Sequence, residues 1–137
     1  MYKVLWLLKR KEGISHEEFR DHFEREHAPL ALKHIGHLFL DYRRNYIDQS
    51  FGRLGVDEKG ESIYGPMEWD WDLISEWILP DEEAYNEIRR IMSGDVIKQF
   101  HALEEKFLDR PAQVMLRCSV EDTGTGGAST RSGKPAS

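Results

Sequence analysis

The residues best suited to acid–base chemistry lie in the stretch 14–37, which holds five of the six histidines of this 137-residue chain. His27 stands out because Pro29 disfavours the helical conformation at Ala28, so a helix through this stretch would end beside His27. The negative end of a helix dipole favours a protonated imidazole, and an imidazole that titrates near neutrality can take and return a proton. We therefore predict that His27 is a general base, with a simple helix C-cap as the alternative.

Two other groupings of these side chains would mean different sites. His27, His34 and His37 together could hold Zn²⁺ or Fe²⁺ and leave a position open. Their spacing matches no helix-borne ligand motif such as His-Glu-x-x-His, so we expect neither a metal nor another cofactor. His22 and Glu26 are four residues apart, which predicts an ordinary solvated pair on a helix.

A second set of candidate groups lies in residues 38–47, whose alternation predicts a strand. Tyr42, Arg44 and Tyr46 fall on one face of that strand. A phenol and a guanidinium that face a cavity could bind a carbonyl or enolate oxygen and stabilise the charge that develops there. In the alternative, Arg44 pairs with Glu76 across the sheet and only satisfies a buried charge.

Tryptophans and acids mark the end of the glycine-rich segment 48–70 and the residues just after it. Side chains here could gate a pocket and supply a carboxylate to a leaving group, and Asp70 is our choice over Glu68 and Asp72. The candidate substrate-binding residues are Trp6, Phe23, Tyr42, Trp69 and Trp77. Trp6 and Trp77 would suit a hydrophobic core at least as well.

The elements that must position these groups follow in a regular order. Strands are predicted over residues 2–8, 38–47, 71–79 and 112–119, with a helix after the first strand and two helices after the third. Residues 48–70 hold four glycines and a proline without periodicity, which predicts a long loop insertion. The order βαββαβ predicts an α+β fold, the ferredoxin-like plait with helices on one face of a four-stranded antiparallel sheet.

The helix that carries His27 has a well-marked start. Ser15 followed by Glu18 forms a capping box, and Ile14 with Phe19 occupies the positions of a hydrophobic staple. These signals place the first turn of the helix directly after Ser15.

Composition limits the classes to which the protein can belong. The length predicts one domain over residues 1–119, and the Gly/Ser/Thr-rich residues 120–137 predict a disordered tail. A net charge of -6 argues against a nucleic-acid surface, and the apolar run 4–8 is far too short to span a bilayer. The single cysteine, Cys118, fits a reducing compartment. We expect a cytoplasmic protein that binds neither nucleic acid nor membrane.

The open face of the predicted sheet points to a partner. Both faces of strands 2–8 and 71–79 are largely apolar, whereas the helices cover only one of them. A second copy laid against the open face would keep this surface from water, so we expect a symmetric homodimer.

Several polar and apolar residues together resemble a known family. Residues 3–19, 27–30 (His-Ala-Pro-Leu), 42–45 (Tyr-Arg-Arg-Asn) and 105–109 (Glu-Lys-Phe-Leu-Asp) are similar to the EthD family of dimeric α/β-barrel proteins. The resemblance spans roughly residues 2–118, and the segment 48–70 is longer than the family pattern. It implies a barrel made by two sheets, with a pocket between each sheet and its helices. Related dimeric barrels include polyketide cyclases and dehydratases, lactone isomerases and small monooxygenases.

These observations lead to one functional hypothesis and two alternatives. The first is a cofactor-independent dehydratase, isomerase or cyclase that acts on a small apolar cyclic or aromatic, polyketide-like carbonyl compound, with His27 as base and Tyr46 or Arg44 binding the enolate. The second is a cofactor-free monooxygenase, whose turnover would stop without oxygen. The third is a non-catalytic binding protein, in which His27 would be dispensable.

Overall fold

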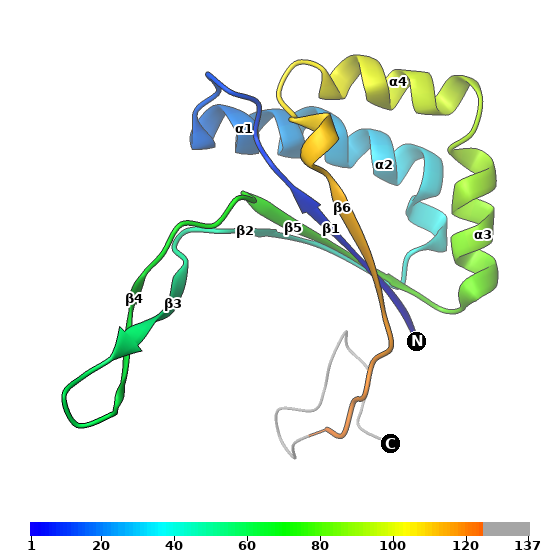
Figure 1. Ribbon diagram of the computed structural model, residues 1–137. Coiled ribbons are helices and arrows are strands. Elements are labelled where there is room, and N and C mark those ends of the chain that lie inside the picture. Colours follow the sequence, from blue (N-terminus) through cyan, green and yellow to red (C-terminus); the bar gives the residue numbers. More distant parts are fainter. Residues whose placement is uncertain (125–137) are drawn as a thin grey trace.

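A four-stranded antiparallel sheet with helices on one face forms the body of the protein. The computed structural model describes residues 1–124 (Figure 1). The strands are β1 (Tyr2–Leu8), β2 (Asp41–Tyr46), β5 (Leu73–Leu79) and β6 (Val114–Cys118), and their order across the sheet is β2-β5-β1-β6. With β1 and β5 in the centre, this is the strand order of the ferredoxin-like plait, so the predicted α+β fold is confirmed.

The helices all cover the same face of this sheet (Figure 1). The first is a continuous rod made of α1 (His16–His22), a π turn η1 (Phe23–His27) and α2 (Ala28–Ile35). Two shorter helices, α3 (Glu82–Ile91) and α4 (Asp95–Glu104), follow β5, and 3₁₀ turns occupy Gly36–Leu38 (η2) and Arg110–Ala112 (η3). As predicted, Ser15 caps α1, because its hydroxyl accepts a hydrogen bond of 3.1 Å from the Glu18 N–H.

The prediction that the first helix ends near His27 is wrong. Ala28 keeps right-handed helical angles (φ -63°, ψ -44°), and the chain continues through Pro29 to Ile35. The wider π turn makes this possible, because the Ala28 N–H donates to the Phe23 carbonyl five residues back. Pro29 then lies at the start of α2, where a proline is tolerated. His27 is therefore in the middle of the rod, where no terminal dipole acts on it.

The core fills the space between this sheet face and the helices in two adjoining clusters. One centres on Val4, Leu79 and Phe100, and the other on Phe19 and Phe107, all at most 2% exposed. Burial of such side chains is the main favourable contribution to folding.

The opposite face of the sheet carries an apolar surface that no helix of residues 1–124 covers (Figure 1). The register places Leu5 between Glu76 and Leu116 on this face, and Leu116 is 42% exposed. An ion pair between Lys3 and Glu76, 2.8 Å apart, lies on the same face. We call this surface the open face.

The segment 48–70, predicted as a long loop, contains a β-hairpin. Strands β3 (Phe51–Val56) and β4 (Ser62–Pro66) pair in antiparallel fashion and extend away from the body (Figure 1). Asp57 closes the turn by accepting hydrogen bonds from the Lys59 and Glu61 N–H groups, and Gly60 has a φ of 81°. We refer to residues 51–67 as the ribbon.

Residues 120–124 form no helix or strand, and the rest of the predicted disordered tail 120–137 lies outside the described residues. No helix of residues 1–124 combines the length and the hydrophobicity needed to cross a bilayer.

Candidate functional site

A cavity of about 280 Å³ lies between the sheet and the helices, and mostly apolar side chains line it. Its walls come from β1, β2 and β5 on one side and from the π turn, α2 and α4 on the other. The cavity brings together five residues that the sequence singled out: Trp6, Phe23, His27, Tyr42 and Trp77. Their roles as base and substrate-binding groups remain predictions.

The central polar feature of the cavity is a hydrogen bond between His27 and Glu104. His27 Nε2 and Glu104 Oε2 are 2.8 Å apart, and each side chain is only 13% exposed. The guanidinium of Arg110 lies 3.6 Å from the other carboxylate oxygen. Phe23 stacks on the imidazole with ring centroids 4.3 Å apart, and Phe100 meets it edge-on. The pair is thus held in a largely apolar setting, where charge interactions are strong.

This geometry determines which nitrogen of His27 can act as a base. In the neutral imidazole, the Nε2–H donates to the Glu104 carboxylate, so the lone pair is on Nδ1. Nδ1 is buried and has no hydrogen-bond partner among the described residues. A buried polar atom without a partner costs about 1–3 kcal/mol, so an unmatched acceptor beside a cavity is a feature to explain by function.

The same cavity contains an unmatched donor. Trp6 Nε1 is also buried and without a partner among residues 1–124. The Trp6 ring packs against the Trp77 ring, with the two ring centroids 5.7 Å apart. An indole N–H can only donate. Two residues that line the cavity thus each hold a buried polar atom without a partner, a donor on Trp6 and an acceptor on His27.

Tyr42 adds a neutral hydroxyl to the lining. Burial raises the pKa of its phenol to about 12, while the charge of Arg44 and the neighbouring Ser75 side chain act in the opposite direction. The Arg44 guanidinium lies 4.6 Å from the centre of the Tyr42 ring. Tyr42 therefore keeps its proton throughout the physiological range and remains able to donate a hydrogen bond.

Arg44 and Tyr46 do not line this cavity, although both point to the helix side of the sheet as predicted. They bind Glu24 of the π turn: Arg44 donates from Nε and Nη2 at 2.9 and 2.8 Å, and the Tyr46 hydroxyl donates at 2.6 Å. The proposed pairing of Arg44 with Glu76 is wrong, because Glu76 lies on the open face with Lys3. The hydrogen bonds from Arg44 lower the pKa of Glu24, and burial raises the pKa of Tyr46.

Replacing Glu24 by glutamine should destabilise the protein at pH 7 and weaken the dependence of its stability on acid. The pKa of Glu24 is lower in the folded protein than in the unfolded chain. Its contribution to the free energy of unfolding is therefore fully present above the unfolded pKa of about 4.3, and it is lost as the pH falls through the lower pKa of the folded state. We expect the free energy of unfolding at pH 7 to fall by about 1–2 kcal/mol. This value allows for the weakening of the interaction by solvent, because the Glu24 side chain is 36% exposed. Urea unfolding between pH 3 and 7 measures it.

The matched control for this variant is Glu87→Gln. Glu87 also pairs with an arginine, Arg90, but on the solvent side of α3. The control should leave the unfolding free energy unchanged, and an equal effect of both substitutions would contradict the structural role of Glu24.

Trp69 and Asp70 also lie outside the cavity, contrary to the prediction. They border an open depression of about 770 Å³ at the base of the ribbon, whose lining also includes Lys9 and Lys11. Trp69 packs against Trp71, whose Nε1–H donates to the Ala112 carbonyl at 2.9 Å. Asp70 does not line the cavity that His27 and Glu104 share, so it has no place in a mechanism centred on that pair.

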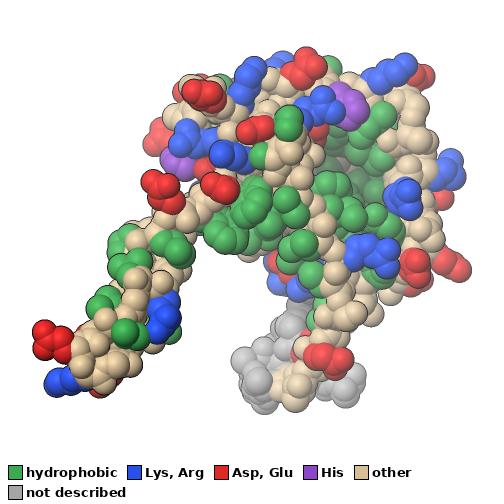
Figure 2. Space-filling model, viewed as in Figure 1, with side chains coloured by type: hydrophobic (Ala, Val, Ile, Leu, Met, Phe, Trp, Pro, Cys, Tyr) green, Lys and Arg blue, Asp and Glu red, His purple; other side chains and the backbone are tan. Residues whose placement is uncertain are grey.

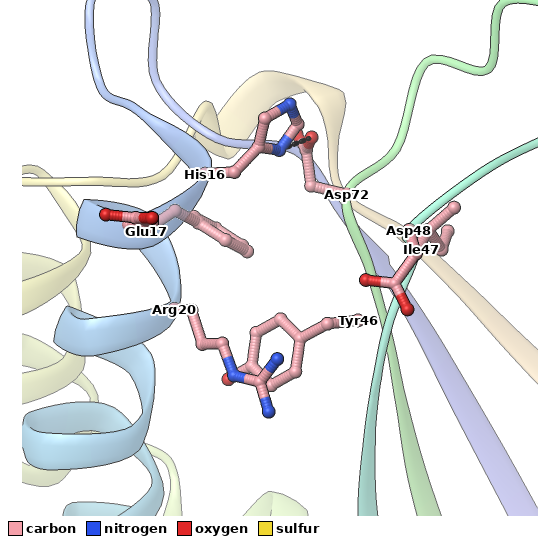
Figure 3. A pocket seen from close by; sticks show the side chains of 8 residues that line it. His16, Glu17, Arg20, Tyr46, Ile47, Asp48 and Asp72 are labelled. Atoms are coloured by element: carbon pink, nitrogen blue, oxygen red, sulfur yellow. Dashed lines mark ion pairs between the residues drawn. The ribbon is translucent and has the colours of Figure 1, made fainter.

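A further hollow of about 320 Å³, near the start of α1, contains Tyr46 (Figure 3). Arg20 lies over the Tyr46 ring at 4.7 Å, and His16 faces Asp72 at 3.3 Å (Figure 3). The backbone N–H of Arg10 also donates to Asp72 at 2.8 Å. None of the buried polar atoms without a partner in residues 1–124 belongs to this hollow, in contrast to the cavity at His27.

Sequence reasoning missed Glu104 altogether. The stripe Val96, Phe100, Leu103 and Phe107 identifies the apolar face of α4, and Glu104 follows Phe100 by four residues. A carboxylate on the core side of a helix was therefore visible, and it is the same kind of anomaly that marked His27. His22 and Glu26 form the predicted four-residue pair, 3.3 Å apart. Within residues 1–124, no three His, Cys, Asp or Glu side chains gather in a way that could hold a metal ion.

Comparisons with known proteins agree with this fold. The family model described as the EthD domain matches residues 11–111. The crystal structure of the Arabidopsis thaliana protein At3g17210 has a TM-score of 0.56 and 13% identity, covering 91% of this chain and 100% of that one. Its solution structure has a TM-score of 0.54 and 14% identity, covering 90% and 91%.

A protein from Thermobifida fusca, described as dimeric, ferredoxin-like and of unknown function, has a TM-score of 0.40 and 10% identity, covering 87% and 90%. No curated protein sequence matches the chain. At these identities, the two Arabidopsis structures show a shared fold and nothing finer.

Proposed function

This chain belongs to the EthD domain family, and we propose that it is a cofactor-independent enzyme that transfers a proton within a small apolar cyclic or aromatic carbonyl compound. The observation that carries the proposal is the His27–Glu104 pair, 2.8 Å apart beside an interior cavity. A carboxylate that holds an imidazole in one tautomer is a common arrangement for general base catalysis. Dehydration, isomerisation and cyclisation all begin with such a step.

In the proposed mechanism, His27 Nδ1 takes the proton from the carbon next to the carbonyl group. The C–H electron pair moves into an enolate, and the imidazole becomes an imidazolium that the Glu104 carboxylate stabilises. The Trp6 N–H and the Tyr42 hydroxyl are the donors available for the enolate oxygen. The imidazolium then returns the proton to another carbon or to a leaving hydroxyl group.

The cavity supports the choice of substrate class. Its volume of about 280 Å³ is near the lower limit of small-ligand pockets, so the substrate must be compact. Trp6, Phe23 and Trp77 offer flat apolar surfaces to a ring, and most of the surface that lines the cavity is apolar. Arg110 and Glu104 neutralise each other in part, so no excess charge calls for an ionic substrate.

Proton exchange tests the first step without knowledge of the complete reaction. 2-Indanone and β-tetralone are suitable probes, because both are compact ring compounds with acidic hydrogens next to the carbonyl group. In D₂O and without oxygen, the protein should accelerate deuterium incorporation at those carbons at least ~10²-fold over buffer, as followed by NMR. Binding of the probes without any faster exchange would contradict the proposal and favour a binding protein.

A further inference from the structure

The ribbon exposes apolar side chains on both of its faces. Phe51 is 61% exposed and pairs across the ribbon with Pro66, and Tyr64 on the same face is 70% exposed. The side chains of Leu54 and Met67 lie over the glycines of the opposite strand on the other face. Soluble proteins rarely expose such surface without a partner for it.

The ribbon also lacks the support that a two-stranded hairpin needs. A hairpin of two strands is marginally stable in water unless a face packs against something. Here the ribbon projects away from the helices and the sheet (Figure 1), and hydrophobic side chains lie along it up to its charged tip (Figure 2). The ribbon is therefore expected to be more stable when another surface covers it.

We propose that the ribbon clasps a second copy of this chain. The ribbon follows β2 in the chain and leads into β5, and it extends on the side of the sheet away from the helices (Figure 1). Between its base and β6, the open face presents a cluster of hydrophobic side chains (Figure 2). In this arrangement a single two-fold contact buries the ribbon and the open face together on each subunit.

The available area agrees with a dimer better than with a smaller contact. Six ribbon side chains, each 43–70% exposed, together present on the order of 500 Å² of apolar surface. They are Phe51, Leu54, Val56, Ile63, Tyr64 and Met67. A stable interface buries about 800 Å² on each partner, so the ribbon supplies a large part and the open face the remainder.

Charge argues against a nucleic acid or an anionic membrane as the occupant. The tip of the ribbon carries Asp57, Glu58 and Glu61 against a single Lys59. An acidic tip would be repelled by phosphates and by anionic lipid headgroups. The partner surface must therefore be apolar and without strong negative charge, as the open face of this chain is.

Photo-crosslinking between labelled subunits tests the proposal directly. Benzoylphenylalanine replaces Tyr64, and light protein is mixed with ¹⁵N-labelled protein so that crosslinks between chains can be distinguished by mass. We expect crosslinked peptides that join a light chain to a heavy one, with the partner residues on or beside its sheet. The same probe at Lys33, on the exposed side of α2, should give no such product. Crosslinks within one chain only would overturn the proposal.

A second measurement uses ordinary substitutions in place of the photoreactive side chain. The double variant Phe51→Ser/Tyr64→Ser should raise the dimer dissociation constant at least ~10²-fold in sedimentation experiments, because two central aromatic contacts are lost. The matched tip variant Glu58→Ser/Lys59→Ser should leave it unchanged. A wild-type protein that is monomeric at micromolar concentration, or a double variant that dimerises normally, would each overturn the proposal. Both results are independent of the catalytic proposal, which concerns the opposite side of the sheet.

Discussion

His27→Gln is expected to lower the protein-catalysed exchange of 2-indanone or β-tetralone protons by at least ~10²-fold. Glutamine is similar in size to histidine and can still donate to Glu104, but it has no lone pair that accepts a proton at neutral pH. The NMR exchange rate with saturating probe measures this loss, and circular dichroism verifies that the helices remain.

His22→Gln is the matched control for that experiment. His22 lies on the same rod five residues earlier, but it pairs with Glu26 and does not line the cavity. We expect near-normal exchange for this variant. Glu104→Gln should give an intermediate rate, because the imidazolium loses its counter-charge while Nδ1 keeps its lone pair. Near-normal exchange in His27→Gln would remove His27 from the mechanism.

Phe107→Ala should reduce the free energy of unfolding by about 3–5 kcal/mol, the usual cost of deleting a fully buried ring. Phe107 is 0% exposed. The centroid of its ring lies 5.8 Å from that of Phe19 and 6.1 Å from that of Phe23. Its ring also meets the edge of His27 at 6.1 Å. The resulting space would loosen the aromatic surroundings that hold the imidazole.

Urea unfolding at pH 7 measures this effect, with Leu32→Ala as the control on the outer side of α2. Leu32 is 50% exposed, so its truncation should cost less than ~1 kcal/mol. A loss of that small size in Phe107→Ala would contradict a fully buried position for Phe107.

Local sequence signals were sufficient for the fold because they agreed with one another. The capping box at Ser15, the alternation in the strands and the apolar stripes of the helices each indicate one element, and their order admits one sheet topology. The ribbon was missed because its glycines remove the alternation by which a strand is recognised. Gly52 and Gly65 leave room there for the side chains of Met67 and Leu54, which lie where a Cβ atom would be.

The candidate site was only partly predictable, for geometric reasons. Alternation placed Tyr42 and Tyr46 correctly on the helix side, but four residues along a strand span about 13 Å, so only Tyr42 reaches the cavity. Trp69 and Asp70 depend on where the ribbon leaves the sheet, which no local pattern indicates. Glu104 comes from a helix far along the chain, and its distance from His27 follows from tertiary packing alone.

The π turn has a consequence for insertions and deletions in this helix. Phe19, Phe23, His27, Ala31 and Ile35 recur at a strict spacing of four and all face the interior. In a regular α-helix each residue advances by about 100°, so a spacing of four would wind this row progressively out of the core. The wider turn takes up part of that winding. Loss of one residue there would rotate either His27 or Phe19 away from the sheet, which makes the length of this segment as constrained as its composition.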